Sequence, residues 1–169
     1  MPAGPQTLPF AVVPASLRDF REILALERLC FARDPWPWMD VMAALTFPET
    51  VRLKAVTTVE PRTNGAVAIG FVIGDRRRSR GLGWVASIGV HPGYQRRGVG
   101  AALLAACERA LETPRVRLTL RPSNLAARRM YEAAGYVVID RLPRYYNDGE
   151  DGVVMEKVVS DRQPAAAGD

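Results

Sequence analysis

A short glycine-containing loop, placed between an apolar run and an amphipathic helical pattern, limits the fold more than any other segment. Two glycines in it carry no side chain that would block a ligand, so backbone N–H groups at the start of the helix can approach phosphate oxygens. The positive end of the helix dipole lies behind them, and two arginines add charge. An anion-binding loop is therefore predicted between a strand and a helix. Its residues are Gln95, Arg96, Arg97, Gly98, Val99, Gly100 and Ala101.

Several kinds of site could contain such a loop. A Walker phosphate loop is excluded, because no Gly-Lys-Ser or Gly-Lys-Thr follows the glycines. A Rossmann site for NADP would use Gly98 and Gly100, with Arg121 at the 2′-phosphate. However, Leu103 replaces the third glycine, and the chain lacks room for a second mononucleotide half. A plain strand-to-helix turn is the simplest alternative, although two glycines in the first helical turn would then cost stability.

Hydrophobic periodicity predicts one α/β domain with a sheet of mixed strand direction. The expected order is strand, two helices, three strands, helix, strand, helix and two strands. We expect a folded domain over residues 10–159, between a loosely ordered N-terminus at 1–9 and a loosely ordered tail at 160–169. Strands are expected at 10–13, 51–59, 66–74, 82–90, 116–120, 136–140 and 153–158, and helices at 16–30, 38–47, 99–111 and 124–134.

Composition narrows the class of protein. The 169 residues are 48% hydrophobic and 24% charged, which is typical of a soluble single domain. The apolar runs are much shorter than a membrane span, so we expect a cytoplasmic protein without a membrane partner. Cys30 and Cys107 form no CxxC pair and are expected to be buried thiols. With His91 as the single histidine, we expect no metal site.

Four arginines, Arg76, Arg77, Arg78 and Arg80, contribute to a net charge of +5. Such a cluster could bind nucleic acid, but no aromatic residues alternate with the arginines as a base-stacking surface would require. We therefore interpret the cluster as a solvated loop between two strands and do not expect a nucleic-acid partner.

Several motifs together resemble the GNAT superfamily of acetyltransferases. The loop at 95–100 matches its Q/R-x-x-G-x-G/A signature, and the later motifs occur in the superfamily's order and spacing. The segment Tyr145–Gly152 is similar to that of ribosomal-protein-alanine N-acetyltransferases and related N-terminal acetyltransferases. The resemblance covers residues 10–158. The later motifs are Arg121-Pro122-Ser123-Asn124, Met130-Tyr131-Glu132 and Gly135-Tyr136.

The resemblance implies a GNAT fold, with a mostly antiparallel sheet of six or seven strands, about four helices and two splayed strands at the cofactor site. Acetyl-CoA would be the cosubstrate, with its pyrophosphate on the amides of the 95–101 loop. Its pantetheine arm would lie along the strand at Ile88, Gly89 and Val90, and Asn124 would bind its amide groups or cap the following helix. Tyr131 would protonate the leaving thiolate, since a phenol is protonated at neutral pH.

One departure concerns the base. Relatives of the alanine N-acetyltransferase type carry a glutamate where this chain has Thr119, which cannot remove a proton from the amine. Solvent or Glu27, on the first helix, would then have to do so. A CoA-binding sensor without turnover is the alternative function.

The resemblance leaves the acceptor open. It would be an amine, either a peptide N-terminus or a small molecule, and the protein a monomer or homodimer. Aromatic residues would line the acceptor side: Trp36, Trp38, Tyr145 and Tyr146.

Overall fold

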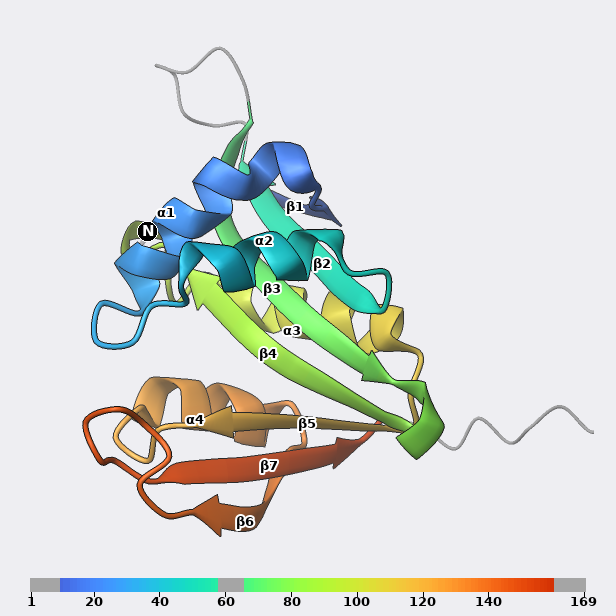
Figure 1. The fold of residues 1–169 in the computed structure, drawn as a ribbon, viewed down its shortest axis with the longest axis vertical. Coiled ribbons are helices and arrows are strands. Elements are labelled where there is room, and N and C mark those ends of the chain that lie inside the picture. The colour runs from blue at the N-terminus through green and yellow to red at the C-terminus, as the bar shows by residue number, and fades with distance from the viewer. Residues whose placement is uncertain (1–9, 58–65, 160–169) are drawn as a thin grey trace, which may run out of the picture.

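The computed structural model describes residues 10–57 and 66–159, which contain one seven-stranded sheet (Figure 1). The sheet order is β1-β2-β3-β4-β5-β7-β6, and every neighbouring pair is antiparallel except β4 and β5. The strands are β1 (Phe10–Pro14), β2 (Thr50–Thr57), β3 (Val67–Arg77), β4 (Leu82–Val90), β5 (Arg115–Leu120), β6 (Val137–Leu142) and β7 (Gly152–Val158). The helices are α1 (Phe20–Cys30), α2 (Trp38–Thr46), α3 (Val99–Leu111) and α4 (Leu125–Ala133).

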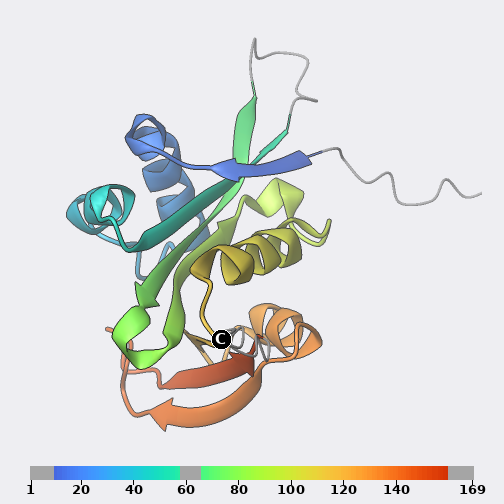
Figure 2. The ribbon, with the colours of Figure 1, turned by 90° about the vertical axis from the view of Figure 1, so that its right-hand side faces the viewer.

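The four helices cover opposite faces of the sheet, with α1 and α2 on one face and α3 and α4 on the other (Figure 2). Each face has its own apolar core. Ile23 and Val41 pack with Phe71 on the α1 side, whereas Leu103 and Leu104 belong to the larger core on the α3 side. Full burial of each such side chain contributes about 1.5–3 kcal/mol. None of the helices in the described ranges is long and apolar enough to span a membrane.

The central strands β4 and β5 separate part-way along their length. They pair only from Leu82 to Val85, opposite Arg115 to Leu118. Directly beyond this point β4 carries a β-bulge, because Ile73 on β3 pairs with Ser87 while the next residue pairs with Val85. A bulge bends and twists its strand, and the carboxyl-terminal part of β4 then diverges from β5 (Figure 1). The predicted fold, including the splayed pair of strands, is confirmed.

The arginine cluster differs from the predicted solvated loop. Strand β3 continues to Arg77, and the Arg76 side chain donates hydrogen bonds to the Ala110 carbonyl at the end of α3. Arg77 pairs with Asp75, and its guanidinium lies 4.9 Å from the Trp84 ring centroid. These interactions hold the end of β3 against α3 and β4. Arg76 and Arg77 therefore have a structural role.

Most element boundaries agree with the prediction to within a few residues. The first helix is the main difference, because Ser16 caps a 3-10 turn (Leu17–Asp19) through a capping box with Asp19, and α1 begins at Phe20. The turn expected between the strands at 51–59 and 66–74 lies outside the described residues. Cys107 is buried as expected, whereas Cys30 is only half-buried.

Candidate active site

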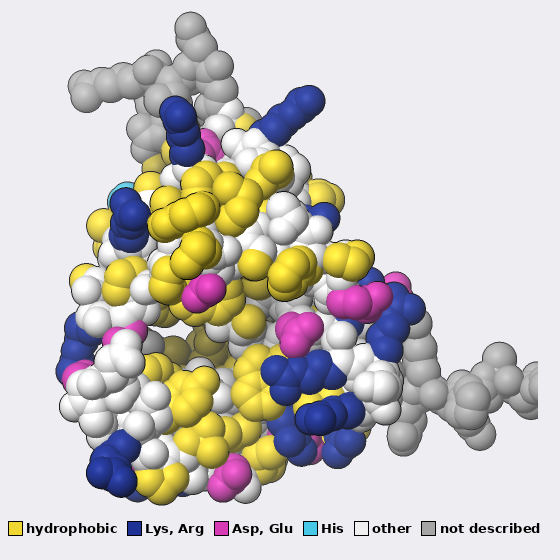
Figure 3. All heavy atoms as spheres, in the orientation of Figure 1, with side chains coloured by type: hydrophobic (Ala, Val, Ile, Leu, Met, Phe, Trp, Pro, Cys, Tyr) yellow, Lys and Arg dark blue, Asp and Glu magenta, His cyan; other side chains and the backbone are white. Residues whose placement is uncertain are grey.

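A cavity of about 600 Å³ occupies the gap between β4 and β5. Figure 3 shows the molecule hollowed between its upper and lower parts. The cavity is lined by α1 and the loop after it, by the diverging ends of both strands, by the start of α3 and by α4. It thus receives side chains from both faces of the sheet. Predicted residues in its wall are Glu27, Trp36, Ile88, Gly89, Val90, Gln95, Arg96, Gly98, Gly100, Ala101, Asn124, Tyr131 and Tyr146.

The amino-terminal end of α3 forms one end of this cavity. Gly98 is its N-cap, with a φ of 82° that favours glycine, and no side chain caps the helix. The first helical hydrogen bond runs from the Ala102 amide to the Gly98 carbonyl. The N–H groups before Ala102 are therefore left for a ligand. A Cβ at Gly98 would meet nothing within 4 Å. This open, positively polarised helix start suits a phosphate group.

The diverging end of β4 forms the floor of the cavity. The Val90 carbonyl accepts hydrogen bonds from the Gln95 side chain and from the Cys30 thiol, at 3.1 Å and 3.4 Å. Gly89 is required here by close packing, because a Cβ would lie 2.8 Å from the Phe71 ring and 3.1 Å from the Cys30 sulfur. Burial raises the pKa of the Cys30 thiol to about 11, with a further contribution from Glu27. The thiol therefore stays protonated and neutral.

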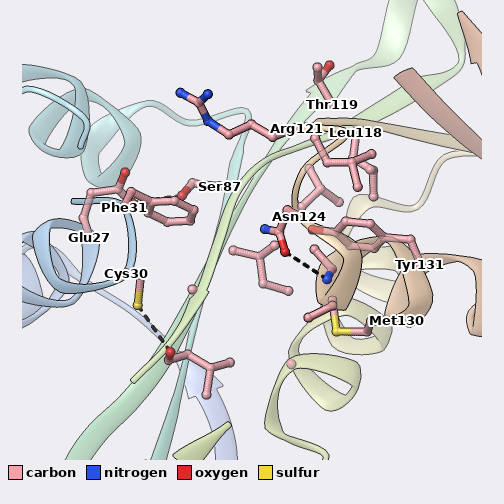
Figure 4. Close-up of a pocket in the computed structure, with 18 of the residues that line it drawn as sticks. Glu27, Cys30, Phe31, Ser87, Leu118, Thr119, Arg121, Asn124, Met130 and Tyr131 are labelled. Atoms are coloured by element: carbon pink, nitrogen blue, oxygen red, sulfur yellow. Dashed lines mark hydrogen bonds between the residues drawn. The ribbon is translucent and has the colours of Figure 1, made fainter. Parts of the chain in front are cut away.

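Helix α4 contributes Asn124 and Tyr131 (Figure 4). The Asn124 side-chain oxygen accepts the Ala127 N–H at 3.1 Å, as an N-cap does, which leaves its amide nitrogen for another partner. Tyr131 is 6% exposed and lines the cavity. Burial raises the pKa of its phenol, with a smaller contribution from Tyr146. Its hydroxyl therefore keeps its proton at neutral pH and can donate it.

Glu27 lies on the opposite side of the gap, in α1, and is 1% exposed. One carboxylate oxygen accepts the Trp36 backbone N–H at 3.1 Å, and the other accepts the Ser87 hydroxyl at 2.9 Å. Burial raises the pKa of this carboxyl, although both hydrogen bonds act in the other direction. The structure thus buries Glu27, which the sequence offered as a possible base, in the cavity wall.

Two loops meet at the mouth of the cavity and are joined by ion pairs. Loop 31–37 follows α1, and loop 143–151 connects β6 to β7. Arg121, at the end of β5, pairs with Asp34 of the first loop and with Asp148 and Glu150 of the second. Its guanidinium also lies 3.9 Å from the Tyr146 ring centroid. We call the group of Arg33, Asp34, Arg121, Asp148 and Glu150 the ionic bridge.

The ionic bridge shifts the acidity of its carboxyl groups. Hydrogen bonds from Ser123 and from Arg121 lower the pKa of Glu150 to about 2, and the bond from Arg121 also lowers the pKa of Asp148. Both groups are therefore charged at neutral pH. Arg33, on the first loop, also pairs with Asp148, on the second loop, so this ion pair joins the two loops directly.

Some predicted residues lie outside the cavity wall. Trp38 and Tyr145 are 54% and 53% exposed and do not line it. The Arg97 guanidinium lies 5.7 Å from the Tyr94 ring instead, and the Val99 side chain is buried in the core. Conversely, the sequence did not indicate Ser87 as part of the site. The apolar pattern of the strand at 82–90 does not indicate that Ser87 bonds to Glu27, because Glu27 is distant in sequence.

Comparison with known proteins agrees with this geometry. The model of the acetyltransferase (GNAT) family matches residues 20–136. An acetyltransferase of Sodalis glossinidius is 31% identical over 127 residues, covering 72% of this chain and 83% of the relative.

Two solved structures share the fold. The ribosomal-protein-S18-alanine N-acetyltransferase from Escherichia coli has a TM-score of 0.76 at 24% identity, covering 90% of this chain and 95% of the other. Arabidopsis thaliana NAA60, in complex with acetyl-CoA, has a TM-score of 0.79 at 19% identity, covering 89% and 99%. The family match and the relatives show that the chain belongs to the GNAT acetyltransferase family, and is thus an acyl-CoA-dependent N-acetyltransferase.

Proposed function

We propose that this protein transfers an acetyl group from acetyl-CoA to the α-amine at the end of a peptide chain. The observation that carries the proposal is the cavity through the splayed strands. It connects the open start of α3, on one face of the sheet, with the α1 side and the two bridged loops. A phosphate-bearing cosubstrate and an amine can therefore approach each other from opposite faces.

The residues present fit acetyl-CoA. The free N–H groups at the start of α3, with Gln95 and Arg96 beside them, would hold the pyrophosphate. The backbone of β4 from Ile88 to Val90 would pair with the pantetheine arm as an added strand does. The Asn124 amide nitrogen would donate to a carbonyl of the same arm. Acetyl-CoA supplies an acyl group activated as a thioester.

The chemical roles follow from the positions of the side chains. The protonated Tyr131 hydroxyl would donate its proton to the thiolate that leaves when the amine has attacked. The backbone N–H of Val90 would donate to the carbonyl oxygen as negative charge develops there. Both groups lie in the cavity wall.

The shape of the cavity mouth favours a slender acceptor. The ionic bridge joins the two loops at this mouth, which favours an amine that enters by the end of a chain. The carboxylates of Asp148 and Glu150 would attract a positively charged ammonium. The fold neighbour that acetylates an alanine of a ribosomal protein also suggests a peptide acceptor.

Thermal unfolding in the presence of acetyl-CoA, free CoA and NADPH tests the cosubstrate. A ligand at about 100 times its dissociation constant stabilises the folded state by about 2.7 kcal/mol. Both CoA species should raise the melting temperature, and NADPH should not. A shift with NADPH alone, or with none of the three, would refute the assignment of the α3 site.

A further inference from the structure

The carboxylate of Glu27 is buried without a cation to compensate its charge. Among the described residues no lysine, arginine or histidine forms an ion pair with it, and its two hydrogen bonds come from neutral donors, the Trp36 N–H and the Ser87 hydroxyl. Burial of an uncompensated carboxylate is strongly unfavourable. This cost requires an explanation beyond the packing of α1.

A neutral side chain could meet the structural requirement. Glutamine has almost the same shape, and its amide oxygen can accept the Trp36 N–H while its amide nitrogen donates to the Ser87 oxygen. The contacts of Glu27 therefore do not require a negative charge. The ability to bind a proton is the property that glutamate has and glutamine lacks.

Glu27 can bind a proton, and it lies in the wall of the cavity in which the proposed reaction takes place. Glu27 and Ser87 line the cavity on the α1 side, across β4 from Tyr131 (Figure 4). At Thr119, on β5, the hydroxyl oxygen is buried and no hydrogen bond to it is present within the described part of the chain. A threonine hydroxyl does not accept a proton at neutral pH. A carboxylate that can do so is available on the opposite wall.

We propose that Ser87 and Glu27 together accept the proton that the acceptor ammonium must lose before it can attack. This inference rests on the proposed function and assigns a role in it. As the N–H bond of the ammonium breaks, the proton passes to the Ser87 oxygen. The original hydroxyl proton of Ser87 passes to the Glu27 oxygen that it already contacts at 2.9 Å. The products are a neutral amine and a protonated Glu27, which later returns its proton to solvent.

The second proton follows a different route. When the C–N bond has formed and the C–S bond breaks, the nitrogen still carries one proton more than the amide product. This proton replaces the one that Tyr131 gives to the thiolate. Two groups on opposite walls thus act at different stages, one as acceptor and the other as donor.

The groups around Glu27 are consistent with this role. The elements packed against α1 are α2, β3, β4 and the 3-10 turn Leu17–Asp19, whose Asp19 pairs with Lys54. The titratable neighbour that interacts electrostatically with Glu27 is Cys30, on the same helix, and its thiol is neutral because its pKa is raised. Burial also raises the pKa of Glu27 above that of an ordinary glutamate. The carboxylate is therefore a stronger base than one in water.

The experiment compares wild type with Glu27→Gln in steady-state acetylation of a peptide with an N-terminal alanine, from pH 6 to 9.5. The α-amine has a pKa of about 8, so only about one tenth is neutral at pH 7. We expect kcat/KM to fall about tenfold at pH 7, because the variant then depends on the fraction of the amine that is already neutral. The deficit should shrink as pH rises past the pKa of the amine, because solvent then supplies the neutral form. A deficit that is the same at every pH, or no deficit, would overturn the proposal.

Two further sets of variants act as controls. Ser87→Ala removes the relay and should reproduce the pH-dependent deficit, whereas Ser87→Thr keeps a hydroxyl and should retain most of the activity. This pair decides the question if Glu27→Gln does not fold. Glu108→Gln changes another buried glutamate, which pairs with Lys157 away from the cavity. It should lower stability and leave the pH profile unchanged.

The outcomes separate the two proposals. If wild type acetylates no peptide and acetyl-CoA does not raise its melting temperature, the proposed function fails, and the proton relay with it. If wild type is active but Ser87→Ala and Glu27→Gln keep the wild-type pH profile, only the relay fails.

Discussion

Replacement of Tyr131 by phenylalanine separates the chemical role of the phenol from its packing. The ring contacts Tyr136, with centroids 5.9 Å apart, and phenylalanine preserves that contact. Only the hydroxyl is lost. We therefore expect the free energy of unfolding to change by less than about 1 kcal/mol. The effect on catalysis should be much larger.

The size of the catalytic effect follows from the proposed role. A positioned general acid contributes about 10²–10⁴ in rate, which corresponds to about 3–5 kcal/mol of transition-state stabilisation. Because the hydroxyl acts on the leaving group, kcat should fall by this factor while the KM for acetyl-CoA changes little. Burial raises the pKa of Tyr131, so wild-type activity should not decline through loss of its proton below about pH 10.

The assay measures release of free CoA with a thiol reagent, using the alanine peptide and saturating acetyl-CoA. Tyr136→Phe is the matched control, because Tyr136 is also buried but does not line the cavity. It should retain wild-type kcat. If Tyr131→Phe keeps more than about a third of wild-type kcat, or if the two variants lose activity equally, the proposed role of the phenol is wrong.

Other predictions concern the start of α3, the core and the ionic bridge. Gly98→Ala places a side chain at a φ of 82° and should cost about 1 kcal/mol of stability. It should also weaken acetyl-CoA binding, measured by calorimetry, about tenfold. Unchanged affinity would contradict pyrophosphate binding at the start of α3. Leu103→Ala removes a fully buried side chain and should lower the free energy of unfolding in urea by about 2–5 kcal/mol; a loss below about 1 kcal/mol would argue against the core described. The folded pKa of Glu150 is lowered to about 2, so its contribution to stability is present above its unfolded pKa of about 4.3 and lost as pH falls toward 2. Urea unfolding should show this loss in wild type and a smaller one in Arg121→Met, and parallel curves would rule out Arg121 as a cause of that shift.

Local spacing was enough to predict the glycine-containing loop and the helix that follows it. Glycines at the first turn of an amphipathic helix leave its N–H groups accessible, and Gly98 does adopt the positive φ that only glycine takes freely. The N-cap role of Asn124 was also expected, because its position after Pro122 and Ser123 favours an N-cap.

Contacts between distant segments could not be predicted in the same way. The hydrogen bond between Ser87 and Glu27 depends on a β-bulge and on the packing of α1 against β4, neither of which leaves a local pattern. The ionic bridge likewise pairs Asp34, in the loop after α1, with Arg121, at the end of β5. These two residues are far apart in the sequence.

The exposed aromatic residues have a similar explanation. Sequence alone gives the hydrophobic character of Trp38 but not the direction in which α2 presents it.

The most direct test of the central claim is to map the acetylated atom on a peptide. The peptide carries a free N-terminal alanine and one internal lysine, and tandem mass spectrometry locates the acetyl group after incubation with the protein and acetyl-CoA. A second peptide with a blocked N-terminus serves as control. The account predicts one acetyl group on the α-amine of the first peptide and none on the second. Transfer to lysine in both peptides, or no transfer to either, would contradict it.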